Sequence, residues 1–260
     1  FARFRVSTAG NLTPTGLAAD GEVEDYPVNI IPVGPLDVTF GTAGAVVTRT
    51  QPDFTDRANG LAIQADGKLV VAGEAYNGSA NQFAVLRYNS DGSLDTSFDG
   101  DGKAFVSFGS NDQDARDIAI QSDGKIVVVG RAHNGSNYDF AIARFNPDGS
   151  LDATFDDDGK QTLSFGSSTD VAYGVSLDGS ARIVVVGASN NGSNFDFAVA
   201  RLNPNGSLDS TFDSDGKVTT PIGAGSDIGY AVAIQPNGQI VVVGDTSNGT
   251  NDDFGIIRLN

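Results

Sequence analysis

One unit recurs four times along the chain at a fixed spacing of 57 residues, and this period limits the possible folds more than any other feature. An apolar run ending in glycine appears as KLVVAG, KIVVVG, RIVVVG and QIVVVG, and its last residues are Gly73, Gly130, Gly187 and Gly244. The same spacing separates Arg87, Arg144, Arg201 and Arg258. Such a period is typical of arrays in which each repeat needs its neighbours to bury its apolar faces.

The second repeat shows how one unit is built. Two apolar runs, 117–121 and 125–130, flank Ser122-Asp123-Gly124, and an Asp-Gly pair between such runs is a strong signal of an antiparallel hairpin. Residues 138–146 and 159–165 supply a third and a fourth strand. Because residues 126–129 are apolar without alternation, we expect both faces of their strand to be covered.

A four-stranded antiparallel sheet that is covered on both faces and repeated at a fixed period predicts an all-β fold, a β-propeller with stacked blades. A solenoid is the alternative, but its coils stack in parallel, whereas the hairpins demand antiparallel neighbours. The repeats fill residues 36–260 and divide at 36–93, 94–150, 151–207 and 208–260. Residues 44–49 resemble a fourth strand placed ahead of its own blade. This strand could complete the last blade and close a four-bladed ring; alternatively, further repeats follow Asn260.

Two repeats depart from the common pattern. The first has FGTAG at residues 40–44 where the others have F-D-x-D-G, so it lacks both carboxylates. The third replaces the Asp-Gly hairpin by LDGSAR at residues 177–182, which predicts a turn shifted by one or two residues.

The composition excludes several classes of function. The formal charge is -17, with 16 Lys and Arg that form no basic stripe, so a nucleic acid is not an expected partner. No apolar run reaches the length of a membrane span, and we expect no membrane insertion. The chain has no Cys, which removes disulfides and thiolate chemistry. Only Glu22, Glu24 and Glu74 are glutamates among 33 acidic residues, and this excess of Asp is typical of turns.

The ordered motifs F-D-x-D-G-K, D-G-K-I-V-V-V-G and D-F-A-I-A-R-F-N-P-D-G-S-L-D-x-T-F are similar to the bacterial delta-sixty repeat, a propeller-type repeat of large secreted and surface proteins. Residues 1–35, which include FARFR at the start and GEVEDY at 21–26, resemble the C-terminal end of a GEVED domain, an extracellular β-sandwich module, followed by a linker. The two resemblances imply an extracellular or cell-surface bacterial protein of mosaic architecture. Neither brings catalytic residues with it.

The Asp-rich turns between the third and fourth strands are the clearest candidates for a metal site. They offer hard oxygen ligands at alternate positions and a glycine for a sharp turn, as calcium requires. The candidate ligands are Asn89, Asp91, Asp95, Asp99 and Asp101, then Asn146, Asp148, Asp152, Asp156 and Asp158, and then Asn203, Asp209, Asp213 and Asp215. The alternative is that these residues only make the turns, with their side chains bonded to nearby backbone. The bidentate glutamate of an EF-hand loop is missing from the pattern.

Two further sets of side chains occupy equivalent positions in the repeats. The arginines of the third strand are Arg87, Arg144, Arg201 and Arg258, which could form a ring of substrate-binding charges. We expect a structural role between blades instead, in which they pair with an Asp such as Asp95, Asp152 or Asp209, since buried charges need partners. The candidate ligand-binding residues are Asn59, Arg116, Tyr173 and Tyr230, which we expect at the mouth of the axial channel, where the first strand of each blade begins. They differ from one another within a repeated frame, as a ligand site requires. Drift in an exposed loop gives the same variation.

The sequence contains no recognisable catalytic constellation. The single histidine, His133, has Tyr76, Asn190 and Ser247 at the equivalent positions, and neither G-x-S-x-G nor a phosphate loop occurs. We therefore expect a non-catalytic module for adhesion, ligand binding or scaffolding, stabilised by calcium if the Asp-rich turns bind it. Its expected partners are other surface proteins, glycans or copies of itself. The alternatives are a structural spacer or filament subunit and, third, an accessory domain of an enzyme.

Overall fold

The computed structural model describes residues 36–51 and 54–260, and the expected GEVED-like segment and linker, 1–35, lie outside them. The described residues form four antiparallel sheets, here called blades 1 to 4, and within each sheet the strands pair in chain order. Within this part of the chain no helix is long and apolar enough to cross a membrane. The all-β class and the repeated antiparallel sheet are therefore as predicted.

Equivalent strands have the same length in every blade, 8 residues in the first three strands and 4 in the fourth. Blade 1 consists of β1 (Asp56–Ile63), β2 (Leu69–Tyr76), β3 (Asn81–Tyr88) and β4 (Lys103–Val106). Blade 2 consists of β5 (Gln113–Ile120), β6 (Ile126–His133), β7 (Tyr138–Phe145) and β8 (Lys160–Leu163). Blade 3 consists of β9 (Asp170–Leu177), β10 (Ile183–Asn190), β11 (Phe195–Leu202) and β12 (Lys217–Thr220). Blade 4 has only β13 (Asp227–Ile234), β14 (Ile240–Ser247) and β15 (Asp252–Leu259).

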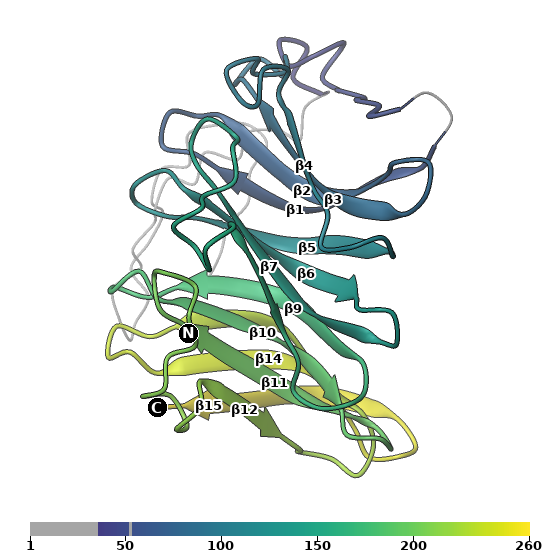
Figure 1. Cartoon of the computed structure of the whole chain (residues 1–260), viewed down its shortest axis with the longest axis vertical. Coiled ribbons are helices and arrows are strands. Elements are labelled where there is room, and N and C mark those ends of the chain that lie inside the picture. Colours follow the sequence, from purple (N-terminus) through teal and green to yellow (C-terminus); the bar gives the residue numbers. More distant parts are fainter. Residues whose placement is uncertain (1–35, 52–53) are drawn as a thin grey trace, which may run out of the picture.

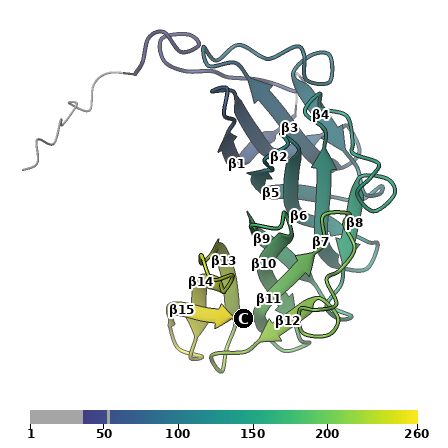
Figure 2. The ribbon, with the colours of Figure 1, turned by 90° about the vertical axis from the view of Figure 1, so that its left-hand side faces the viewer.

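The blades follow one another along the long axis of the molecule (Figure 1) and fan out as an open arc (Figure 2). Their first strands form the inside of the arc, where β1 packs on β5, β5 on β9 and β9 on β13. Between described residues, β13 and β1 do not pack on each other in this way. The blades are those of a β-propeller, arranged in a ring that these four blades do not close.

Each junction between blades contains its own apolar core. At the junction of blades 2 and 3, Val129 and Phe140 pack against Ile183 and Ala198, and all four are fully buried. Residues 126–129 of β6 are fully buried as well, with alternate side chains in the cores on either side. The second strand of an inner blade is thus covered on both faces, as its unbroken apolar run predicts.

The prediction that residues 44–49 form a strand and complete the last blade is wrong. These residues form no strand, and β15 has no fourth strand beside it within the described chain. The segment instead runs along blade 1, where Tyr88 donates a hydrogen bond to Thr48 (Oη to Oγ1, 2.9 Å) and the Thr50 backbone N–H donates to Asp56 (2.8 Å). The turn before this segment, at residues 40–44, also contacts blade 1, because Gly41 N–H donates to the Asp91 carbonyl (2.7 Å). The same kind of bond joins blades 1 and 2, where Asp99 N–H donates to the Asp148 carbonyl (2.7 Å).

The third hairpin keeps the register of the others, so the predicted shift of its turn is also wrong. Ala181 N–H donates to the Asp178 carbonyl (3.0 Å), just as Gly124 N–H donates to the Gln121 carbonyl (2.9 Å). Ala181 adopts the left-handed conformation (φ 59°) that Gly124 adopts in the second hairpin (φ 85°). An alanine accepts this backbone at a cost of about 1–2 kcal/mol.

Candidate functional site

The four candidate ligand-binding residues are the extra residues of four equivalent β-bulges in the first strands. The pairing of β1 with β2 skips Asn59, that of β5 with β6 skips Arg116, that of β9 with β10 skips Tyr173, and that of β13 with β14 skips Tyr230. Each is the fourth residue of its strand. They therefore lie in the middle of the inner strands and not where those strands begin. We call these four residues the inner row.

A glycine on the neighbouring strand makes each bulge possible. A Cβ added to Gly130 would collide with the backbone carbonyl of Asp114, which the bulge pushes toward β6. Gly73, Gly187 and Gly244 meet the carbonyls of Arg57, Val171 and Ile228 in the same way. The last letter of the repeated apolar run is thus fixed by the backbone of the strand beside it.

Three members of the inner row stack on one another across blades 2, 3 and 4. The guanidinium of Arg116 lies over the ring of Tyr173, 4.7 Å from its centroid, and the Tyr173 and Tyr230 rings meet edge to face at 5.2 Å. Asn59 joins the row through its side-chain amide, which donates to the Ala115 carbonyl of blade 2 (2.8 Å). The sequence-predicted residues are therefore brought together, and Tyr230 remains 43% exposed.

Charged side chains line the same edge in blades 1 and 2. Arg57 pairs with Glu74 across β1 and β2, and Asp114 accepts bonds from Arg116 (2.7 Å) and Arg131 (2.6 Å). Burial raises the pKa of Glu74, the nearby Asp114 raises it further, and the positive charge of Arg57 opposes both. In blade 3 the equivalent pair is Val171 and Ala188.

The aromatic end of the row is also acidic. Burial raises the pKa of the Tyr230 hydroxyl, and the Asp245 carboxylate adds to this effect. Asp245 lies on β14, at the position that Glu74 and Arg131 occupy in blades 1 and 2. The inner edge of the arc therefore changes from paired charges at one end to tyrosines and a carboxylate at the other.

The candidate calcium ligands are engaged mainly with protein donors. Asp91 and Asp148 accept bonds from the backbone and hydroxyl of Ser93 and Ser150, and Asp101, Asp158 and Asp215 accept the backbone N–H two residues ahead. Asn89, Asn146 and Asn203 donate to serine hydroxyls. Asp99, Asp156 and Asp213 adopt positive φ at the sharp bend. Among residues 36–51 and 54–260, no three acidic or histidine side chains are grouped as a metal site. Calcium binding stays a prediction.

The predicted pairs between the strand arginines and the turn aspartates are confirmed. Arg144 Nε lies 2.7 Å from Asp152 Oδ2, and both side chains are only 4% exposed. The Arg144 guanidinium also stacks on Phe155 (4.8 Å to the ring centroid) and donates to the Pro204 carbonyl of the next repeat. Arg87 and Arg144 thus connect their own strand, the Asp-rich turn and the following blade, whereas Arg201 bonds Asp209 and Thr211 of its own repeat.

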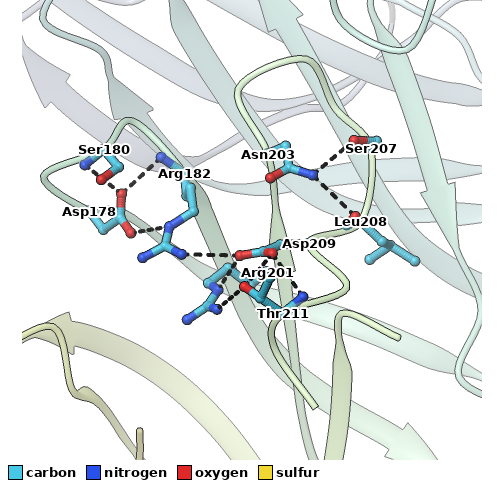
Figure 3. A network of polar contacts seen from close by, with 9 residues as sticks. All are labelled: Asp178, Ser180, Arg182, Arg201, Asn203, Ser207, Leu208, Asp209 and Thr211. Atoms are coloured by element: carbon cyan, nitrogen blue, oxygen red, sulfur yellow. Dashed lines mark hydrogen bonds and ion pairs between the residues drawn. The ribbon is translucent and has the colours of Figure 1, made fainter. Parts of the chain in front are cut away.

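A second cation, which sequence reasoning missed, reaches each of these aspartates from the hairpin of the same blade. Lys68 bonds Asp95 (2.8 Å) and Lys125 bonds Asp152 (3.0 Å). In the third repeat Arg182 takes this place, bonding both Asp178 and Asp209 (Figure 3). The hydrogen bond from Thr211 lowers the pKa of Asp209 to about 2 against the effect of burial, and Arg201 assists. The signal available in the sequence was the basic residue that closes these three hairpins.

The match to a family model agrees with the fold. Four segments, 64–98, 121–155, 182–212 and 235–260, match the family model "Domain of unknown function (DUF5122) beta-propeller". No curated protein matches the sequence. Similar solved structures include a protein of unknown function from Bacteroides caccae (15% identity, TM-score 0.43, 77% of this chain and 60% of that one). Virginiamycin B lyase from Staphylococcus aureus (13%, 0.44, 80% and 60%) and an endo-arabinase from Bacteroides thetaiotaomicron (11%, 0.41, 83% and 79%) are further ones.

The chain spans only 60% of the length of the first two of these structures. The identities and TM-scores are too low to transfer any activity to this chain. What the matches support is that its four repeats are similar to a beta-propeller repeat of a family of unknown function.

Proposed function

We propose that this chain is a non-catalytic ligand-binding module of an extracellular or cell-surface protein, and that the inner row is its binding surface. The observation that carries the proposal is the continuous stack of Arg116, Tyr173 and Tyr230. These side chains occupy the one bulge position in each repeat, so the frame holds them in line while their identities differ. Rigid aromatic side chains with a polar tip are effective ligand contacts because little side-chain entropy is lost on binding.

The chemistry of the row favours a glycan as the ligand. The partly exposed tyrosine rings offer apolar faces and hydroxyl tips, and Arg116 and Arg131 offer several donors. Asp114 and Glu74 lie beside them and hold Arg116, Arg131 and Arg57 in place by ion pairs. A sugar ring presents hydroxyl donors and acceptors around an apolar C–H face, so it can use both kinds of group at once.

The position of His133 is consistent with a non-catalytic role. This histidine stands at the end of β6, where its ring meets Tyr138 edge to face (4.9 Å between centroids) and its Nδ1 accepts the Gly135 backbone N–H (3.1 Å). The extracellular location follows from the sequence motifs that resemble the delta-sixty repeat, and it is part of the proposal. The formal charge of -17 disfavours a nucleic acid as the ligand.

A glycan array followed by calorimetric titration of the bound glycan tests the proposal. Replacing Tyr173 and Tyr230 together by alanine should weaken binding at least tenfold, whereas Phe105→Ala, on the outer strand of blade 1, should leave it unchanged. Thermal melting of both variants checks that each is folded. Absence of any glycan ligand, or equal affinity of the row variant and the wild type, would contradict the proposal.

A further inference from the structure

The outer face of blade 4 exposes side chains that the other blades bury. Phe254 is 96% exposed, Ile256 66% and Val243 40%. The residues at the position of Phe254 in blades 1 to 3 are Phe83, Phe140 and Phe197, and all three are fully buried by the next blade. No described segment covers this face of blade 4.

The buried phenylalanines show which part of the next blade this face contacts. A Cβ built on Gly187 of β10 would lie 2.9 Å from Cζ of Phe140, and one built on Gly255 of β15 would lie 3.1 Å from Cζ of Phe197. The rings of Phe140 and Phe197 therefore lie directly on the backbone of the following blade, at a glycine of its second or third strand. The same position in β3 is Ala84, and the glycine of β2 is Gly73.

Blade 1 presents the matching half of such a junction. A pocket of about 290 Å³ is lined by Val71, Gly73, Ala84 and Leu86, with residues 46–48 and Thr50 among its walls. Gly73 and Ala84 hold the positions of Gly187 and Gly255, which meet the ring of the preceding blade. Val71 and Leu86 hold positions that belong to the apolar cores of the other junctions. We call this the blade 1 pocket.

The first strand of blade 1 continues the same surface. Leu61 is 61% exposed and Ile63 is 67% exposed. Their equivalents in blade 3, Val175 and Leu177, belong to the apolar core that blade 3 shares with blade 2. One chain thus carries both halves of a single interface, separated at the two ends of its arc (Figure 2).

We infer that copies of this chain associate head to tail, with Phe254 of one copy seated in the blade 1 pocket of the next. The contact repeats the apolar junction that the chain already makes three times internally, with residues 46–48 and Thr50 as an additional wall. An interface between two different surfaces of the same molecule forms a ring if its rotation closes and a longer array if it does not. A buried aromatic anchor in a pocket is the usual centre of such an interface.

Sedimentation velocity over a range of protein concentrations tests the inference. The chain should form dimers or larger assemblies, and Phe254→Asp should weaken the association at least tenfold without lowering the melting temperature, since this side chain is exposed. Ile222→Asp replaces another exposed apolar residue, between β12 and β13, and should leave the association unchanged. A chain that is monomeric at every concentration would overturn the inference, as would equal association of the Phe254→Asp variant and the wild type.

The absence of Cys in the chain allows a second, direct test of the contact. Chains carrying Ile256→Cys are mixed with chains carrying Val47→Cys, at the edge of the blade 1 pocket, and treated with a short bis-maleimide. Cross-linked pairs should form, and adding Phe254→Asp to the first chain should reduce them at least tenfold. Ser79→Cys in the β2–β3 loop replaces Val47→Cys as the control. Equal yields with Val47→Cys and Ser79→Cys would overturn the proposed pairing.

Discussion

A single hydrogen atom at Gly130 in place of a methyl group allows blade 2 to bulge. A Cβ at this position would collide with the Asp114 carbonyl, and neither backbone can move without breaking the β5–β6 ladder. We predict that Gly130→Ala lowers the free energy of unfolding by about 3 kcal/mol, as overpacking of a rigid site does. Urea denaturation measures this change. Gly166→Ala, where a Cβ meets nothing within 4 Å, is the control and should change stability by less than about 0.5 kcal/mol.

The strained backbone at Ala181 offers a prediction of opposite sign. This residue is left-handed (φ 59°) where the other hairpins carry glycine. We predict that Ala181→Gly raises the free energy of unfolding by about 1 kcal/mol, because relief of the Cβ strain exceeds the added entropy of the unfolded chain. The same denaturation experiment applies. Gly124→Ala should be destabilising, and a stability loss in Ala181→Gly would show that the hairpin is not strained.

At the scale of elements, the arginine in the third strand connects one blade to the next. We predict that Arg144→Leu lowers the free energy of unfolding by about 3 kcal/mol, because Asp152 stays buried with one of its two cations removed. Differential scanning calorimetry should show a lower melting temperature. The chain supplies its own control, since Arg258 holds the same position in blade 4 but is exposed. Arg258→Leu should have almost no effect, and equal effects of the two changes would refute the structural role.

Strand and hairpin positions were predictable because their signals are local. The apolar run 126–129 and the Asp-Gly pair beside it specify a covered strand and an antiparallel turn without knowledge of the rest of the chain. The arginine–aspartate pairs also followed from one rule, that a buried charge needs a partner. Segment 44–49 was misassigned because its composition suits a strand, but a strand exists only where a neighbouring edge pairs with it.

The candidate site was predictable in its residues but not in its geometry. The variation at Asn59, Arg116, Tyr173 and Tyr230 is visible in the aligned repeats, whereas their place in β-bulges depends on the register of the paired strands. The pairs Arg57 with Glu74 and Asp114 with Arg131 were missed for the same reason. Their partners are opposite each other only because the hairpin fixes which residues face across it.

At the scale of the whole molecule, the arc has two different ends and a strongly acidic surface. The charge of -17 keeps separate copies apart at long range, and this repulsion is screened at physiological salt. Apolar contact between blade faces is less sensitive to salt. Head-to-tail association, if driven by Phe254 and the blade 1 pocket, should therefore strengthen as the salt concentration rises.

Because the surface is acidic, any divalent cation can stabilise the protein by screening, and a calcium titration needs magnesium as its control. Burial and the neighbouring carboxylates of Asp101 and Asp148 raise the pKa of Asp99, and burial with Asp157 and Asp158 raises that of Asp156, so any cation that screens these turns stabilises them. Most of the other turn carboxylates already accept bonds from protein donors. We predict that millimolar calcium raises the melting temperature no more than magnesium at equal ionic strength. A rise of several degrees that calcium alone produces and a chelator reverses would show a specific site, since a ligand that binds only the folded state stabilises it by mass action. The variants Asp99→Asn and Asp156→Asn would then locate that site.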